Sequence, residues 1–231
     1  MSTNPLTLSG TNTYSGATTV LASTLTIGSN GSINATSGVV IGAGEFNYNS
    51  DTPLTQGITF SGTEGTLSGT GTIGIPVSVT SGNSHAPGGV GTVGNQHFSA
   101  DLTYADGSIF EWDLNDNSTS MGFDMVGADG AISVDTTNTV FRVVFGENVE
   151  MTDGFWNTPN GTQTWLMTSI FGKNLSSGSF QRVETNYDVS QYGSFTISDT
   201  SLVYTSFATI PEPSNVLVGL LVGAALVRRR R

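Results

Sequence analysis

The stretch Leu6-Thr7-Leu8-Ser9-Gly10-Thr11 carries the clearest structural signal, because an alternating three-residue burst runs directly into a Ser-Gly turn. A close copy follows at Ile58-Thr59-Phe60-Ser61-Gly62-Thr63, and Ser-Gly-Thr recurs at residues 68–70. In each burst the apolar side chains share one face and Thr or Ser takes the other. Short strands that repeat with glycine corners predict a solenoid, in which each coil buries its inner face against the next.

Similar bursts continue to about residue 104, separated by Ser-Gly, Asn-Gly and Pro-Gly-Gly turns. They occupy residues 6–8, 19–21, 25–27, 39–41, 58–60, 72–73, 77–79 and 102–104. No window in this half has the pattern of an amphipathic helix. We therefore expect an all-β protein whose residues 1–104 form a parallel β-helix, with Leu, Ile and Val inward and Thr and Ser outward.

The next region, residues 105–209, has longer and more aromatic strand patterns. They fall at residues 108–114, 140–145, 164–167 and 194–197, and all three tryptophans lie in this region. Eleven acidic residues are found between Asp101 and Asp153, and we expect a solvated acidic face there. This region is predicted to be an irregular β region that caps or extends the solenoid.

Composition narrows the function classes. Gly, Ser and Thr make up 91 of the 231 residues, but 36% of the chain is hydrophobic and falls in regular bursts, which argues against disorder. There is no cysteine, so disulfides and thiolate metal sites are ruled out. Residues 1–227 contain 3 basic and 18 acidic side chains, and a chain without a basic face is not expected to bind nucleic acid.

The tail, residues 210–231, differs from the rest of the chain. Pro211, Glu212 and Pro213 break any strand, and twelve uncharged residues, 216–227, follow them. As a helix these twelve rise about 18 Å, short of the roughly 30 Å hydrocarbon core. The large apolar residues of this predicted helix are Val216, Leu217, Val218, Leu220, Leu221, Val222, Leu226 and Val227. A block of four arginines follows them: Arg228, Arg229, Arg230 and Arg231. An all-apolar helix with an arginine end predicts membrane contact, with the arginines cytoplasmic and the body outside.

Pro211-Glu212-Pro213, the apolar helix and the terminal arginines closely resemble the PEP-CTERM sorting signal of Gram-negative bacteria. The resemblance implies export, transient anchoring in the inner membrane, and cleavage of the tail by an exosortase, a membrane transpeptidase-like enzyme. The released body would then reach the cell surface, the outer envelope or the extracellular matrix, where exopolysaccharide is an expected partner. A protein that keeps its tail and stays anchored is the alternative.

The repeats resemble autotransporter-associated β-strand repeats. The resemblance rests on residues 6–20, 24–28 and 66–74 and on Ala86-Pro87-Gly88-Gly89, and it covers roughly residues 6–95. It implies a right-handed parallel β-helix in a surface or secreted protein. Exported proteins of this kind begin with a signal peptide, which Met1-Ser2-Thr3-Asn4-Pro5 does not resemble. We therefore expect the recorded start to lie inside a longer gene.

Few residues suggest chemistry, and we expect neither an enzyme nor a cofactor. His85 and His97 are the only histidines, and the Gly/Pro context of His85 predicts a surface turn. Glu111 and Asp113 share one face of a strand, as paired catalytic carboxylates do, but we expect surface acids.

The segment Asp113 to Asp124 partly matches calcium-loop spacing, with Asn115 and Asn117 as further oxygen ligands. Ser118 stands where glycine is usual and Asp124 where glutamate is usual, which favours a polar hairpin loop while leaving calcium as the alternative.

These observations predict a non-enzymatic, exported structural or adhesive protein without a metal site. The alternative is a carbohydrate-active enzyme or carbohydrate-binding module on a β-helix scaffold. A cleft with convergent carboxylates and aromatic side chains would favour the enzyme, and a featureless polar wall would favour the structural role.

Overall fold

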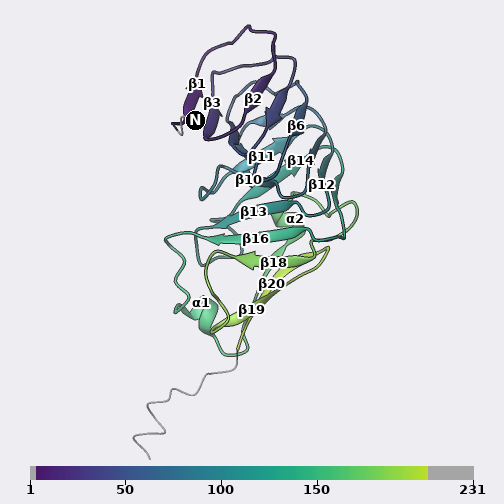
Figure 1. Cartoon of the computed structure of the whole chain (residues 1–231). Helices are drawn as coiled ribbons and strands as arrows, with labels where there is room; N and C mark the ends of the chain where they lie inside the picture. The colour runs from purple at the N-terminus through teal and green to yellow at the C-terminus, as the bar shows by residue number, and fades with distance from the viewer. Residues whose placement is uncertain (1–3, 208–231) are drawn as a thin grey trace, which may run out of the picture.

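The computed structural model describes residues 4–207, and this part of the chain is mostly β-structure with two short helices. Figure 1 shows the strands stacked from β1 (Leu6–Leu8) at one end to β19 (Gly193–Ile197) and β20 (Ser201–Ser206) near the other. The all-β class expected from the sequence is confirmed.

The largest sheet has eight strands, and every neighbouring pair in it is parallel. Its order is β1, β3 (Thr24–Ile27), β5 (Glu45–Tyr48), β7 (Thr66–Gly69), β10 (Ser84–Pro87), β13 (Ile109–Leu114), β16 (Val140–Phe145) and β18 (Arg182–Thr185). Parallel neighbours need a crossover, so the chain leaves this sheet after each strand and returns beside it.

Three smaller parallel sheets contain the crossover strands. The first contains β2 (Thr18–Val20), β4 (Val39–Ile41) and β6 (Ile58–Phe60). The second contains β8 (Thr72–Ile73), β11 (Asn95–Phe98) and β14 (Met125–Ala128), and the third β9 (Val77–Val79), β12 (Leu102–Tyr104) and β15 (Ile132–Val134).

The returns to the large sheet are regular at first. Leu6 pairs with Leu25, Leu25 with Phe46 and Phe46 with Leu67, separations of 19, 21 and 21 residues. The same column of paired residues continues through His85, Phe110 and Phe141, at separations of 18, 25 and 31 residues. Pairing also crosses the expected boundary at residue 105, because β10 pairs with β13 and β12 with β15.

The sequence match between residues 6–8 and 58–60 does not mark equivalent strands. Leu6–Leu8 is β1 of the large sheet, whereas Ile58–Phe60 is β6 of a smaller one. The strand equivalent to β1 in the next return is β3. An alternating burst followed by Ser-Gly-Thr describes any short strand and its turn, so it does not identify the sheet that the strand joins.

The expected alternation of faces is found on several short strands but not on β1, where Leu6 is 56% exposed. Val77 and Val79 are buried while Ser78 between them is exposed, and Val39 and Ile41 are more buried than Val40. Glycine permits a tight backbone approach at Gly69, which has φ +113° and whose missing Cβ would point into the Tyr48 backbone.

At the end of the molecule where β18 closes the large parallel sheet, the architecture changes. An antiparallel sheet lies there, in the order β17 (Thr162–Leu166), β20, β19. Helices α1 (Gly154–Asn157) and α2 (Met167–Ile170) flank β17 in the chain. Trp156 and Trp165 are fully buried, with ring centroids 5.9 Å apart, so an aromatic core lies at this end.

Within residues 4–207 no helix is long and apolar enough to cross a membrane. The expected tail helix and its Pro211-Glu212-Pro213 motif lie outside the described residues.

Candidate functional site

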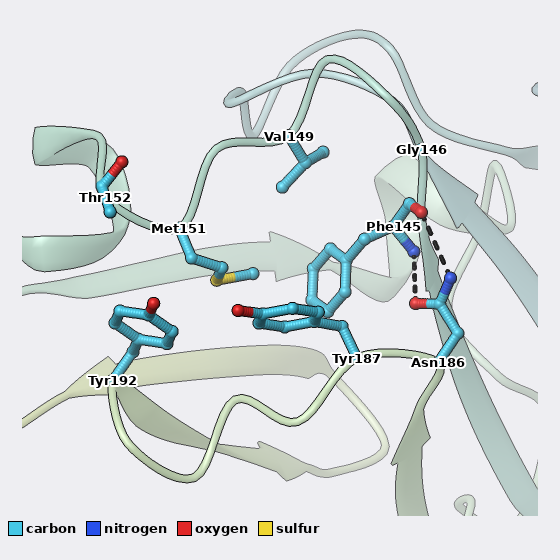
Figure 2. A pocket seen from close by; sticks show the side chains of 8 residues that line it. All are labelled: Phe145, Gly146, Val149, Met151, Thr152, Asn186, Tyr187 and Tyr192. Carbon is cyan, nitrogen blue, oxygen red and sulfur yellow. Dashed lines mark hydrogen bonds between the residues drawn. The ribbon is translucent and has the colours of Figure 1, made fainter.

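A pocket of about 310 Å³ opens between two loops near the antiparallel sheet (Figure 2). One loop follows β16, and the other joins β18 to β19. The lining residues are all uncharged: Phe145, Gly146, Val149, Met151, Thr152, Asn186, Tyr187 and Tyr192. The pocket therefore combines aromatic and apolar walls with neutral hydrogen-bonding groups.

Asn186 fastens the two loops together. Its backbone N–H donates to the Val143 carbonyl at 3.2 Å, so it continues the pairing of β18 with β16. Its side-chain Oδ1 accepts the Phe145 N–H at 2.9 Å, and its Nδ2 donates to the Phe145 carbonyl at 3.2 Å (Figure 2). These bonds set the position of Tyr187, the next residue in the chain.

Tyr187 and Tyr192 form one wall of the pocket. Their ring centroids are 6.5 Å apart and their planes differ by 25°. Nearly parallel rings at that separation are offset sideways, and Figure 2 shows them side by side. The turn between them is closed by the N–H groups of Tyr192 and Gly193, which both donate to the Val189 carbonyl, at 2.8 and 3.0 Å. Tyr187 is 45% exposed, so its ring is open to a ligand.

Phe145, Val149 and Met151 lie across the pocket from the tyrosines (Figure 2). The Phe145 ring meets the buried Trp156 edge to face, with centroids 5.6 Å apart and planes at 88°. Met151 is buried as well. This wall therefore packs against the aromatic core.

The pocket lining contains no carboxylate, histidine, lysine or arginine side chain. Four carboxylates adjoin lining residues in the chain but are exposed and do not line the pocket: Glu147, Glu150, Asp153 and Asp188. Hydroxyl groups of Thr152 and the two tyrosines, with the Asn186 amide, are its polar groups. None of these residues was singled out from the sequence.

The paired carboxylates of β13 are buried, so the expectation of surface acids is wrong. Glu111 is 8% exposed and lies 3.5 Å from Arg142, whereas Asp113 is 3% exposed and neither of its carboxylate oxygens has a hydrogen-bond partner. Burial raises the pKa of Asp113 to about 7, and the negative charge of Glu111 adds to the rise. The nearby backbone of Gly91 and Thr92 acts in the opposite direction and lowers the pKa of Asp113, although it forms no hydrogen bond with either carboxylate oxygen.

Two of the candidate calcium ligands, Asn117 and Asp124, form hydrogen bonds within the protein. Asp124 is fully buried and accepts the N–H groups of Gly94 at 2.7 Å and Asp113 at 2.9 Å. Asn117 Oδ1 accepts the Trp156 indole N–H at 2.5 Å. Burial raises the pKa of Asp124 to about 9. Within residues 4–207 no group of three His, Asp or Glu side chains is placed to hold a metal ion.

His85 is a core residue, and its expected place in a surface turn is wrong. It lies in β10, fully buried, between Leu67 and Phe110 of the neighbouring strands. Its Nδ1 bonds the Tyr104 hydroxyl at 2.7 Å and its Nε2 bonds Gln96 Oε1 at 2.9 Å. Burial lowers the pKa of His85 to about 4, so the ring is neutral.

His97 is on the surface. Its side chain is 42% exposed, with Nε2 3.4 Å from a carboxylate oxygen of Asp129. The structure therefore separates the two histidines by environment.

Neither the models of known protein families nor the curated proteins contain a match to this chain.

Proposed function

We propose that this protein is a non-enzymatic, exported structural or adhesive component of the cell surface or extracellular matrix, built on a right-handed parallel β-helix. The observation that carries the proposal is the stack of parallel strands that returns to one sheet at separations of 19, 21 and 21 residues. Such a stack has polar outer faces and grows by adding coils, which suits an extended surface element.

The sorting part of the proposal rests on the tail sequence. An exosortase would recognise Pro211-Glu212-Pro213 while residues 216–227 lie in the membrane and the four arginines stay in the cytoplasm. Two prolines favour an extended backbone, which a processing enzyme needs at a cleavage site. The helix would hold the protein at the membrane only until the tail is removed.

The non-enzymatic role is supported by the two kinds of site in the folded body. The carboxylates that could act as acid and base are buried under β-structure, and the open pocket is lined by uncharged residues. Of the alternatives considered from the sequence, the pocket favours carbohydrate binding over carbohydrate cleavage.

The test is processing in a bacterium that has an exosortase, with the full chain placed behind an export signal. We expect the mature protein to lack residues 214–231 by intact mass and to leave the membrane fraction. Glu212→Ala should keep the tail and stay in that fraction, while Asp199→Asn, an exposed acid outside the motif, should be processed normally. A wild-type mature mass that includes the tail overturns the sorting proposal.

A further inference from the structure

We infer that the pocket between residues 145–152 and 186–192 binds a neutral pyranose unit of a polysaccharide. This gives the adhesive role proposed above a ligand class, and it rests on that role only for its place in the cell. The two tyrosines and the Asn186 amide are the groups that would contact the sugar.

The tyrosine wall matches the flat face of a sugar ring. The Tyr187 and Tyr192 planes differ by only 25°, and their centroids are 6.5 Å apart, so the rings present adjoining faces (Figure 2). An aromatic face carries negative charge density and attracts the weakly positive C–H groups of a pyranose. A cage for a quaternary ammonium needs rings set at steep angles around the cation, and this pair is too nearly parallel.

The polar groups of the pocket fit hydroxyl groups. Asn186 Oδ1 uses one lone pair and Nδ2 one hydrogen on Phe145, which leaves an acceptor and a donor on the same amide. The Thr152 hydroxyl also lines the pocket, at the opposite end from Asn186 (Figure 2). Groups that can both donate and accept suit a ligand whose hydroxyls do the same.

Charge around the pocket selects against acidic sugars. The lining is uncharged, and the flanking loops contain the exposed acids Glu147, Glu150 and Asp188. These carboxylates would repel a uronate or a sulfated sugar. The volume of about 310 Å³ lies at the small end of ligand pockets, which span roughly 300–1,000 Å³, so one or two sugar rings are the expected occupants.

Calorimetric titration of the full chain tests the inference. The probes are tetramers of glucose, galactose and mannose, a tetramer of galacturonic acid, and choline. We expect saturable binding of at least one neutral tetramer and at least tenfold weaker binding of the galacturonate tetramer and of choline. Tighter binding of either of these two, or no binding of any neutral tetramer, overturns the inference.

Variants assign the binding to the pocket. Tyr187→Ala should weaken binding about tenfold or more, whereas Tyr187→Phe, which keeps the ring, should change it less than about threefold. The matched control is Tyr14→Ala, because Tyr14 is 40% exposed and lies in the first loop of the chain, far from the pocket lining. Thermal melting of each variant checks folding. Unchanged sugar binding by a folded Tyr187→Ala variant overturns the inference.

The two proposals fail separately. Sugar binding in solution does not depend on sorting, so unprocessed protein that still binds a neutral tetramer contradicts the exosortase proposal alone. Protein that is processed and released but binds no neutral tetramer contradicts the pocket proposal alone.

Discussion

Arg142 lies in register with Glu111 on the adjacent strand, and its Nη1 is 3.5 Å from the Glu111 Oε2. On its other side Arg142 pairs with Glu184 of β18, with Nη2 3.1 Å from Oε2. One guanidinium thus links three parallel strands. Because Glu111 is 8% exposed while Glu184 is more open, the arginine matters most for the buried partner.

Removing this arginine should destabilise the fold in a pH-dependent way. Burial already raises the pKa of Glu111, and Arg142→Met would raise it further by removing the opposing charge. An acid whose folded pKa lies above its unfolded value makes stability fall as pH rises, so the loss should be larger at pH 8 than at pH 5. We expect about 1–3 kcal/mol at pH 8 by urea unfolding.

The control for that experiment is Arg182→Met. Arg182 is 51% exposed and pairs with Glu184, so its loss should cost about 1 kcal/mol or less. Equal losses for the two variants, or a loss at Arg142 that does not change with pH, would contradict the role given to Arg142.

Asp113 should make the wild-type protein less stable as the pH rises from about 4 to about 7. Its pKa of about 7 in the folded state exceeds the ordinary value of 3.8, so the folded state binds more protons between these values. Its contribution therefore falls as pH rises from about 4 to about 7. Asp113→Asn removes this titration. The free energy of unfolding of the variant, relative to that of wild type, should therefore increase as pH rises through this window.

The measurement is chemical unfolding of both proteins at pH 4, 5, 6, 7 and 8. Taking the difference between them cancels the titration of His85, which both proteins share. The charge of Asp113 also raises the pKa of Asp124, so the difference reports both effects of that charge. A difference that stays constant with pH, or that moves in favour of the wild type, would show that Asp113 ionises normally in the folded protein.

We expect His85 to stabilise the fold through its packing in the core. His85→Ala leaves a cavity in the column between Leu67 and Phe110 and removes partners from Tyr104 and Gln96. We expect a loss of about 3–5 kcal/mol, as for other large core side chains. His97→Ala, at a surface position, should change stability by about 0.5 kcal/mol or less. Similar losses for the two histidines, measured by urea unfolding, would refute the assignment of His85 to the core.

Period-2 patterns located many strands well. Alternation predicts strands at residues 77–79 and 102–104, and the longer, more aromatic pattern predicts one at residues 140–145; these are β9, β12 and β16. Strand β10 was missed because Ser84-His85-Ala86-Pro87 has turn-forming residues on both sides and a polar ring inward. The burial of His85 comes from the strands on either side of it, which no local window contains.

The pocket could not be located from the sequence for a similar reason. Its walls come from loops about 40 residues apart, and they meet only because β16 and β18 pair in parallel. The hydrogen bonds from Asn186 to Phe145 follow from that pairing. The burial of Asp113 likewise depends on strand stacking, since alternation alone does not separate an inward face from a solvated one.

Gly69 provides the sharpest test of the coil corners. Its φ of +113° is a conformation that residues with a Cβ rarely adopt, and a Cβ there would collide with the Tyr48 backbone. Gly69→Ala should therefore cost at least about 1–3 kcal/mol from backbone strain, before the collision is added. Gly57→Ala is the matched control, because nothing lies within 4 Å of its Cβ position, and it should be neutral or stabilise by about 0.4–1 kcal/mol. Equal melting temperatures for the two variants would mean that the corner at residue 69 can relax, and the tight approach of β7 to Tyr48 would then not be needed for the stack.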